Sequence, residues 1–232
     1  MSGTRVEFLV PPDFVAFAAV DDVEEAYERV VERLGPSAQD LGPDQRRAVT
    51  DLYLAASAAL TDAGVIWSGT CFGTVAGRLS AATLSVTQIG TEDDSSQEVA
   101  VQGLIEALTV PSGPAGPPSR LVSRFDAAVG PVVITLERSE GWQIAPQERI
   151  PLLSAKAYLP LPSGSNRVLI IELSTPDVDH WPDVYAPALV QVVRSVRLSG
   201  LAATTSAAEP IRRTSTTAPA GPDDPFATVV HP

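Results

Sequence analysis

The stretch VIWSGTCFGTVAGRLSAATLSVTQI, residues 65–89, decides the fold. Residues 65–75 and 81–89 are rich in Val, Ile, Thr, Trp and Phe, and Gly77-Arg78 lies between them. Two such runs around a glycine-containing turn predict a β-hairpin. Gly69, Gly73 and Gly77 do not form a phosphate-binding loop, because that loop leads from a strand into a helix and this segment leads into another strand. Glycines within a strand are more typical of bulges and bends.

Further strands follow the hairpin along the chain, with connections too short for the crossovers that a parallel sheet needs. Short strands are also expected near both ends of the folded region, and the last of them would close the sheet. The predicted strands cover residues 6–10, 121–127, 132–138, 154–159, 167–173 and 195–198. The sequence therefore predicts an antiparallel sheet of about six to seven strands.

Apolar residues recur at three- and four-residue spacing in four segments, residues 21–34, 43–63, 97–108 and 181–194, which predicts helices. The first two would form an N-terminal helical hairpin, in which Asp22 and Glu25 resemble a capping box. The stripe expected to be buried on the second helix comprises Val49, Leu52, Tyr53, Ala56, Ala59, Leu60 and Ala63.

From Ser199 onward Ala, Thr, Ser and Pro dominate, which predicts a disordered C-terminal tail. The fold class is therefore α+β, an antiparallel sheet flanked by helices. The expected plan is a strand and helical hairpin over residues 1–64 that pack on a main domain, a sheet with two helices over residues 65–198 as that domain, and the tail over residues 199–232.

Composition excludes several classes of protein. A single cysteine, Cys71, rules out an intramolecular disulfide, and with only two histidines, His180 and His231, a zinc site is not expected in a monomer. We expect no metal or other cofactor. A net charge of −12 argues against nucleic acid and anionic membrane surfaces as partners. Neither a secretory signal nor an apolar run of 18 residues is seen, so a cytoplasmic location without membrane insertion is expected.

Chemically reactive side chains are few. Cys71 is most simply interpreted as a small buried hydrophobe, since a nucleophilic thiol needs an electropositive site and usually a histidine base. His180 would become a general base if Asp177, Asp179 or Asp183 raised its pKa. Lys156, the only lysine, is the sole candidate for a Schiff base. Carboxylate pairs could also arise among Glu137, Glu140, Glu148 and Glu172, but their spacing does not single out a catalytic pair. We assign no catalytic residue.

Two regions are candidates for binding another protein. The helical hairpin is acidic, and Glu24, Glu25, Glu28 and Glu32 would present negative charge to an arginine-rich partner. In the tail, the apolar residues Phe226, Val229 and Val230 follow a long polar stretch, as in short docking peptides. The run Arg212-Arg213-Thr214-Ser215-Thr216-Thr217 is typical of a basophilic kinase substrate, but a tolerated low-complexity tail is the simpler interpretation.

The segment from Arg167 to Leu198, RVLIIELSTPDVDHWPDVY followed by VVRSVRL, resembles the closing unit of Mog1/PsbP-like proteins. These end with a core strand, a turn containing Thr-Pro, a helix that carries Trp and Tyr, and a final strand. The resemblance covers about 30 residues, and the N-terminal helices have no place in it. It implies a non-enzymatic scaffold whose members bind other proteins, and it implies no catalytic or cofactor residue.

The leading hypothesis is therefore a non-enzymatic adaptor or accessory factor that binds another protein. The arginine-, proline- and alanine-rich composition suggests a GC-rich bacterium such as an actinobacterium, where a role in a secretion or phage-like assembly would fit. One alternative is a hydrolase or transferase with a site near His180, and another is a sensor of small molecules with an apolar pocket. An exposed sheet edge would also allow a homodimer.

Overall fold

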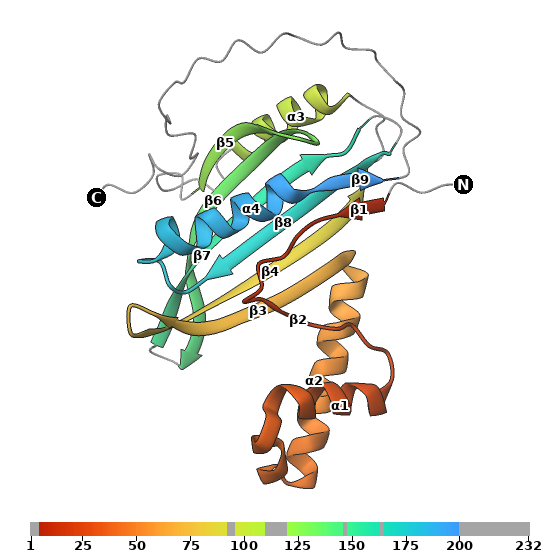
Figure 1. Cartoon of the computed structure of the whole chain (residues 1–232), viewed down its shortest axis with the longest axis vertical. Helices are drawn as coiled ribbons and strands as arrows, with labels where there is room; N and C mark the ends of the chain where they lie inside the picture. The colour runs from red at the N-terminus through yellow and green to blue at the C-terminus, as the bar shows by residue number, and fades with distance from the viewer. Residues whose placement is uncertain (1–4, 92–95, 110–119, 146–147, 163–164, 200–232) are drawn as a thin grey trace, which may run out of the picture.

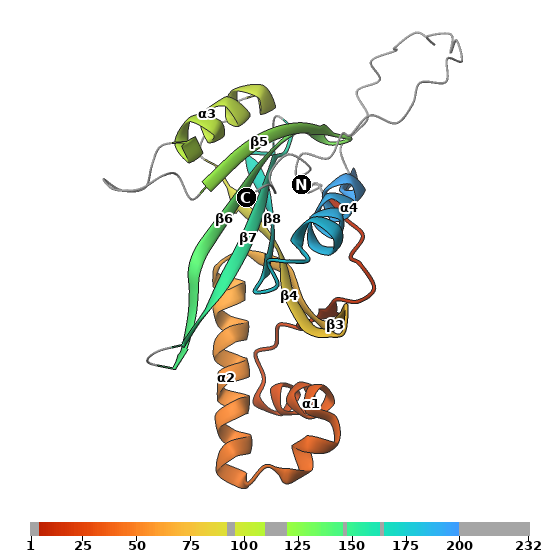
Figure 2. The same cartoon turned by 90° about the vertical axis from the view of Figure 1, so that its left-hand side faces the viewer.

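The computed structural model of the chain describes residues 5–91, 96–109, 120–145, 148–162 and 165–199. A twisted antiparallel sheet lies at its centre, with helices α3 (Gln97–Thr109) and α4 (Ala186–Ser195) on opposite faces (Figures 1 and 2). A helical hairpin projects away from one end of the sheet, as both views show. The α+β class is confirmed.

The main sheet has seven strands in the order β2-β3-β4-β8-β7-β6-β5, and every neighbouring pair is antiparallel. This agrees with the predicted number of strands and with their antiparallel pairing, although the two-residue edge strand β2 was not predicted. The strands are β2 (Val15–Ala16), β3 (Val65–Val75), β4 (Arg78–Gly90), β5 (Arg120–Ala127), β6 (Gly130–Ala145), β7 (Glu148–Pro160) and β8 (Arg167–Thr175).

The hairpin of β3 and β4 has a two-residue turn at Ala76 and Gly77. Both residues have positive φ angles, 48° and 77°, and the flanking Val75 and Arg78 are paired across the strands. Positive φ at both central positions is the geometry of a type I′ turn, which matches the natural twist of two antiparallel strands. The turn therefore comes one residue earlier than the predicted Gly77-Arg78, and β4 begins at Arg78.

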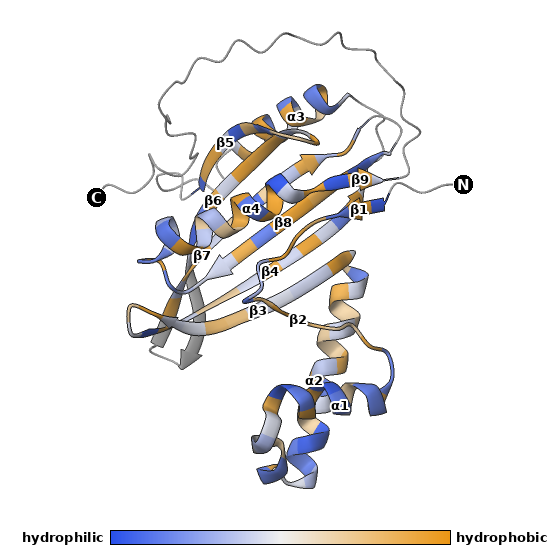
Figure 3. Ribbon diagram, in the orientation of Figure 1, coloured by the Kyte–Doolittle hydropathy of each residue, from blue (hydrophilic) through white to orange (hydrophobic). Residues whose placement is uncertain are grey.

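The main core lies between the sheet and α4. A π-helical turn, Trp181–Tyr185, leads into α4 and places Trp181 in the core with only 1% of its surface exposed. The central strands β6, β7 and β8 are largely apolar in colour in Figure 3. Complete burial of one large aliphatic side chain contributes about 1.5–3 kcal/mol, so this layer dominates the stability of the fold. Its fully buried members include Leu84, Val86, Ile171, Leu173, Leu189, Val192 and Val193.

Helix α3 covers the other face of the sheet, beside β5, β6 and β7. Gln97 at its start donates hydrogen bonds from Nε2 to the carbonyl oxygens of Val129, at 2.9 Å, and Pro160, at 2.7 Å. Glu98 accepts two hydrogen bonds from Arg124 of β5. Polar contacts to two neighbouring hairpins therefore hold the start of α3 in place, and Val101 of this helix is fully buried.

The two short terminal strands form a separate sheet. β1 (Arg5–Glu7) pairs antiparallel with β9 (Arg197–Ser199), and the amide of Leu9 donates to Ser195 Oγ at 2.8 Å. The expectation that the last strand closes the main sheet is therefore wrong. β9 follows α4, which lies on one face of the sheet, so the strand meets β1 there and not at a sheet edge.

The helical hairpin consists of α1 (Val23–Leu34), a 3₁₀ helix (Gly35–Asp40) and α2 (Pro43–Asp62). Asp22 caps α1 by accepting hydrogen bonds from the amides of Glu24 and Glu25, as the sequence predicts for this N-cap. The hairpin has a small core of its own, in which Ala26, Val30 and Tyr53 are buried.

One predicted feature of α2 is wrong. Thr50, Tyr53 and Ser57 form the buried face of α2, whereas Leu52, Ala59 and Ala63 of the predicted stripe are exposed. Helix α2 carries apolar residues on two faces, and only one of them packs against α1 and the segment that precedes it. Leu52 keeps 69% of its surface exposed as a result.

The predicted tail lies outside the described residues except for Ser199, which belongs to β9. In the part of the chain that the structure describes, no helix is both long and apolar enough to cross a membrane. The boundaries at residues 64 and 198 stay predictions.

Candidate functional site

His180 lies in a buried polar cluster between β8 and α4. Its Nδ1 is 2.8 Å from Oδ1 and 2.9 Å from Oδ2 of Asp177. The same carboxylate accepts a hydrogen bond from Ser80 Oγ, which is also hydrogen-bonded to the hydroxyl of Tyr185. Of the three aspartates considered for His180, the structure therefore brings Asp177 to the ring, while Asp179 pairs with Arg78 at 3.1 Å.

The carboxylate of Asp177 is held in its ionised form. Burial raises its pKa, but hydrogen bonds from Ser80 and His180 lower it by more, so the pKa lies below its ordinary value. The amide of Asp177 also donates to Thr175 Oγ1 at 3.0 Å, and that hydroxyl donates to the carbonyl oxygen of Ala81. This network ties the turn before α4 to strand β4.

The order of these groups does not suit nucleophilic catalysis. A serine is activated when a histidine lies between it and a carboxylate, so that the ring can take the hydroxyl proton. Here Asp177 lies between Ser80 and His180. An adjoining pocket of about 300 Å³ is lined by Asp177 and two arginines, Arg78 and Arg138, but His180 does not line it. The arrangement is that of a structural polar network.

Sequence reasoning missed Ser80 as a partner of Asp177, and Tyr185 as a partner of Ser80. A signal was present for Ser80, because it continues the alternation of the buried residues Ala82, Leu84 and Val86 along β4. A hydroxyl at a core-facing position needs a hydrogen-bond partner, and sequence alone does not identify that partner.

Cys71 has no activated thiol. It lies on β3 opposite Ala82, half-buried against the main core. Burial raises its pKa, which disfavours the reactive thiolate. Among the described residues no hydrogen bond joins Cys71 to His180, whose Nδ1 is held by Asp177.

Charged side chains on the face opposite α4 are paired across strands. Arg120 of β5 lies 3.1 Å from Glu137 of β6, and Lys156 of β7 lies 3.3 Å from Glu172 of β8. Ser154 Oγ donates to the other oxygen of Glu172 at 2.8 Å. Two of the four candidate carboxylates are therefore bound by cations, and the side chains of Glu140 and Glu148 lie outside the described part of the molecule. The described residues hold no cluster of three or more His, Cys, Asp or Glu side chains suited to a metal ion.

The four glutamates predicted to bind a partner are all exposed on α1. Arg29 lies between two of them along the helix, 3.4 Å from Glu25 and 3.2 Å from Glu32. These exposed ion pairs are weak, and they neutralise part of the acidic surface locally. Glu24 and Glu28 form no such pair with a described residue. Phe226, Val229 and Val230 lie outside the described residues.

An uncovered apolar face runs along α2, and we call it the α2 stripe. Its members, Ala48, Leu52, Ala55 and Ala59, are spaced by four, three and four residues, which places them on one side of a helix. All four are exposed, on the side of α2 opposite its buried face.

An acidic border follows one edge of the α2 stripe. It consists of Asp44, Asp51 and Asp62, which are exposed and spaced by seven and eleven residues, so they follow the stripe along the helix. Residues 21–62 hold ten acidic and four basic residues, which is half of the net charge of the chain. The sequence predicts the acidity, but it does not show that an apolar stripe on α2 is left uncovered.

Comparison with known proteins gives no family for this chain: no family model matches it, and no curated protein sequence matches it.

Proposed function

We propose that this protein is a non-enzymatic binding module that recruits a basic protein through the α2 stripe. The observation that carries the proposal is Leu52, which is 69% exposed at the centre of an apolar helix face with an acidic border. Isolated apolar residues on a surface are ordinary, whereas a continuous apolar face bordered by charge is typical of an interaction site.

The surroundings of the stripe favour a helical partner. The hairpin projects from the sheet, so the outer side of α2 is open along its length (Figure 2). Three of the four stripe residues are alanine, which allows the backbone of a second helix to approach closely. An amphipathic helix lays its own apolar face on such a surface at i, i+3, i+4 and i+7 positions.

Charge selects the partner. Two copies of this hairpin would bring like charges together, which opposes pairing of the stripe with itself. A helix flanked by arginine or lysine would instead meet the acidic border with opposite charge. The exposed glutamates of α1 extend the negative field, which increases the rate of encounter with a basic protein at low salt.

The sheet domain also favours a binding module over an enzyme. Asp177, His180 and Ser80 form a structural network, which gives the hydrolase or transferase alternative no support. The resemblance to Mog1/PsbP-like proteins also implies a scaffold that binds proteins. Docking through Phe226, Val229 and Val230 stays a competing prediction.

The test is capture of partners from the native cell by the full-length protein and its variants, followed by titration of the purified partner. We expect a basic protein that is retained by wild type and lost on Leu52→Gln and on Glu24→Lys with Glu28→Lys. Leu79→Gln is the matched control, because Leu79 is an exposed leucine on β4, away from the hairpin. His180→Ala should leave capture unchanged.

Further measurements distinguish binding at the α2 stripe from binding at the C-terminal tail. Raising salt from about 50 to 300 mM should weaken binding of the purified partner to wild type, since exposed charges are screened over about 10 Å at 0.1 M salt. A partner that is acidic, or that Leu52→Gln and Leu79→Gln affect equally, contradicts the proposal. Loss of the partner only when Phe226, Val229 and Val230 are replaced by alanine moves the interface to the tail.

A further inference from the structure

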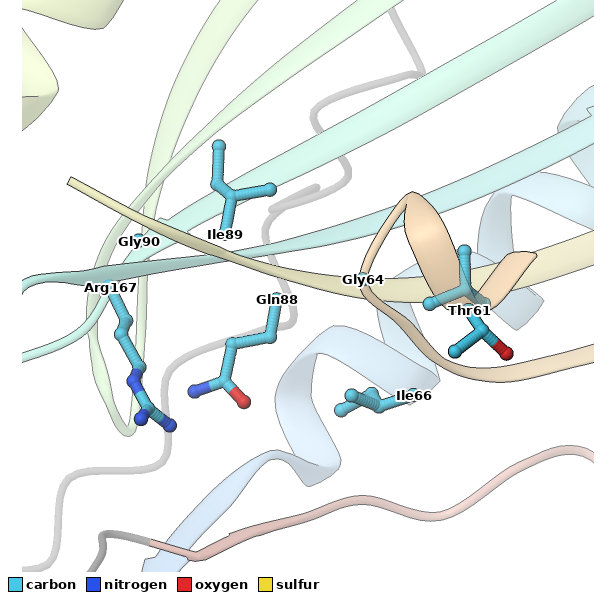
Figure 4. A pocket seen from close by; sticks show the side chains of 8 residues that line it. Thr61, Gly64, Ile66, Gln88, Ile89, Gly90 and Arg167 are labelled. Atoms are coloured by element: carbon cyan, nitrogen blue, oxygen red, sulfur yellow. The ribbon is translucent and has the colours of Figure 1, made fainter. Parts of the chain in front are cut away.

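A pocket of about 470 Å³ lies where the helical hairpin joins the sheet (Figure 4). The end of α2, the start of β3, the end of β4 and the start of β8 contribute its walls. Its volume falls within the range of small-ligand sites. It is separate from the α2 stripe, and the proposed protein binding makes no use of it.

Backbone contacts hold the walls of this pocket together. Gly64 ends α2 with a φ of 72°, and its carbonyl oxygen accepts a hydrogen bond from the amide of Gln88 at 3.0 Å. Gly90 pairs with Arg167 across β4 and β8, and the amide of Thr91 donates to the carbonyl oxygen of Asn166 at 2.7 Å. The pocket is therefore formed by main-chain structure before any ligand binds.

A polar side chain in the pocket wall has no partner. The Nε2 of Gln88 is buried, and none of the described residues accepts a hydrogen bond from it. A buried donor without an acceptor costs about 1–3 kcal/mol. Such a group in a pocket wall is available to donate a hydrogen bond to a bound acceptor.

Arg167 supplies a second donor beside this amide. Its exposed guanidinium has no ion pair with a carboxylate of the described residues. Figure 4 shows Gln88 and Arg167 on the same side of β4, with the amide nitrogen directed toward the guanidinium. Two hydrogen-bond donors that face one another are both satisfied when an anion lies between them.

The charge of these donors and the apolar side chains beside them determine which kind of anion fits the pocket. One guanidinium and one neutral amide provide a single positive charge, and the planar fork of arginine matches a carboxylate. Ile66 lies on the same side as Gln88 and is 48% exposed, while Ile89 points to the opposite side of β4 (Figure 4). A ligand that combines a carboxylate with an apolar group would therefore cover both parts of the pocket.

We infer that this pocket binds a small organic carboxylate with a short apolar chain. The carboxylate accepts hydrogen bonds from Arg167 and from Gln88 Nε2, and the chain lies on Ile66 toward Thr61 at the end of α2. Arg167 is exposed, so its side chain can change rotamer around a bound carboxylate.

The test is titration of the full-length protein with 4-methylpentanoate, followed by calorimetry and by backbone NMR shifts. We expect saturable binding with a Kd of about 1 mM or lower. The neutral isostere 4-methylpentanamide should bind about tenfold more weakly, because it lacks the charge that Arg167 recognises. Acetate should also bind more weakly, since it has no chain to cover Ile66. Shift changes should be largest at residues 61–66, 88–90 and 167.

Variants separate this site from general attraction to positive charge. Arg167→Gln should lower the affinity about tenfold and remove the preference for carboxylate over amide. Gln88→Glu should abolish binding, because the new carboxylate takes the place of the ligand beside Arg167. Arg138→Gln is the matched control, since Arg138 is exposed and lines the other pocket, so it should leave binding unchanged. Circular dichroism confirms that each variant is folded.

Three outcomes overturn the inference. The first is an absence of saturable binding by wild type. The second is equal loss on Arg167→Gln and Arg138→Gln, which means that binding follows overall charge. The third is equal affinity for acid and amide, which means that the pocket recognises only the apolar chain.

Discussion

The imidazole Nδ1 of His180 lies 2.8 Å from Oδ1 of Asp177, at the turn that joins β8 to α4. The Asp177 side chain is only 11% exposed, and Ser80 donates to the same carboxylate. A buried carboxylate with two such donors stabilises the turn only while it is ionised. A hydrogen bond between a histidine and an aspartate can indicate a general base. Here the bond between His180 and Asp177 instead holds α4 on the sheet.

The first prediction concerns acid stability. Because the folded-state pKa of Asp177 lies below its ordinary value of 3.8, the ionised carboxylate contributes stability that is complete above that value and is lost as the pH falls through the lower folded-state pKa. Asp177→Asn should lower the free energy of unfolding at neutral pH by about 1–3 kcal/mol. As the pH is lowered, this variant should also lose less free energy of unfolding than wild type does. Urea denaturation monitored by circular dichroism between neutral pH and about pH 3 measures both effects.

The control for this prediction is Asp179→Asn. Asp179 pairs with Arg78, but both side chains are more than two-thirds exposed, so the pair contributes little. Its loss should change the free energy of unfolding by less than about 1 kcal/mol. Equal effects of the two substitutions would show that the Asp177 network stabilises the protein no more than an exposed ion pair does.

The second prediction concerns the end of α2. Gly64 has a φ of 72°, and a Cβ at this position would lie 2.9 Å from the carbonyl oxygen of Gln88. Gly64→Ala should therefore destabilise the protein by at least about 1 kcal/mol. At Gly73 a Cβ would meet no atom within 4 Å, so Gly73→Ala should change the free energy of unfolding very little. Thermal unfolding of both variants tests the difference, and similar melting temperatures would contradict it.

The third prediction concerns the core of the helical hairpin. The ring of Tyr53 stacks on Phe17 with centroids 4.3 Å apart, and its hydroxyl donates to the carbonyl oxygen of Ala18 at 2.8 Å. Tyr53→Phe keeps the stacking and leaves that carbonyl without its partner, so it should cost about 1 kcal/mol in free energy of unfolding. Tyr27→Phe on α1 removes a hydroxyl with no hydrogen bond to a described residue, and no loss is expected. Denaturant titration compares them, and equal losses would count against the bond to Ala18.

The fourth prediction concerns the only thiol. Burial raises the pKa of Cys71, so the fraction present as thiolate at pH 8 is smaller than in an unfolded chain. The native protein should react with Ellman's reagent at least about tenfold more slowly than the protein in urea. Since the chain has one cysteine, the absorbance change reports this residue alone. A native rate as fast as the unfolded rate would show that Cys71 is accessible and that its pKa is not raised.

Local patterns were sufficient for much of the fold. The change from three- and four-residue spacing before Gly64 to β-rich runs after it locates the junction of α2 and β3. Short connections require antiparallel pairing, and Asp22 marks the start of α1. These features depend on residues close in sequence, and for that reason they can be read from it.

The sequence by itself determined the class of the fold, the helices, most strands, and the acidity of the hairpin. Only the tertiary structure decided which apolar residues are covered, because burial depends on what packs against a face and not on its periodicity. Thus Tyr53 is buried and Leu52, one residue earlier, is exposed. Tertiary structure also decided the two polar sites. Ser80 and Asp177 are 97 residues apart in the chain, and Gln88 and Arg167 line one pocket because β4 pairs with β8. Contacts between residues so far apart in the chain arise only when the sheet has formed.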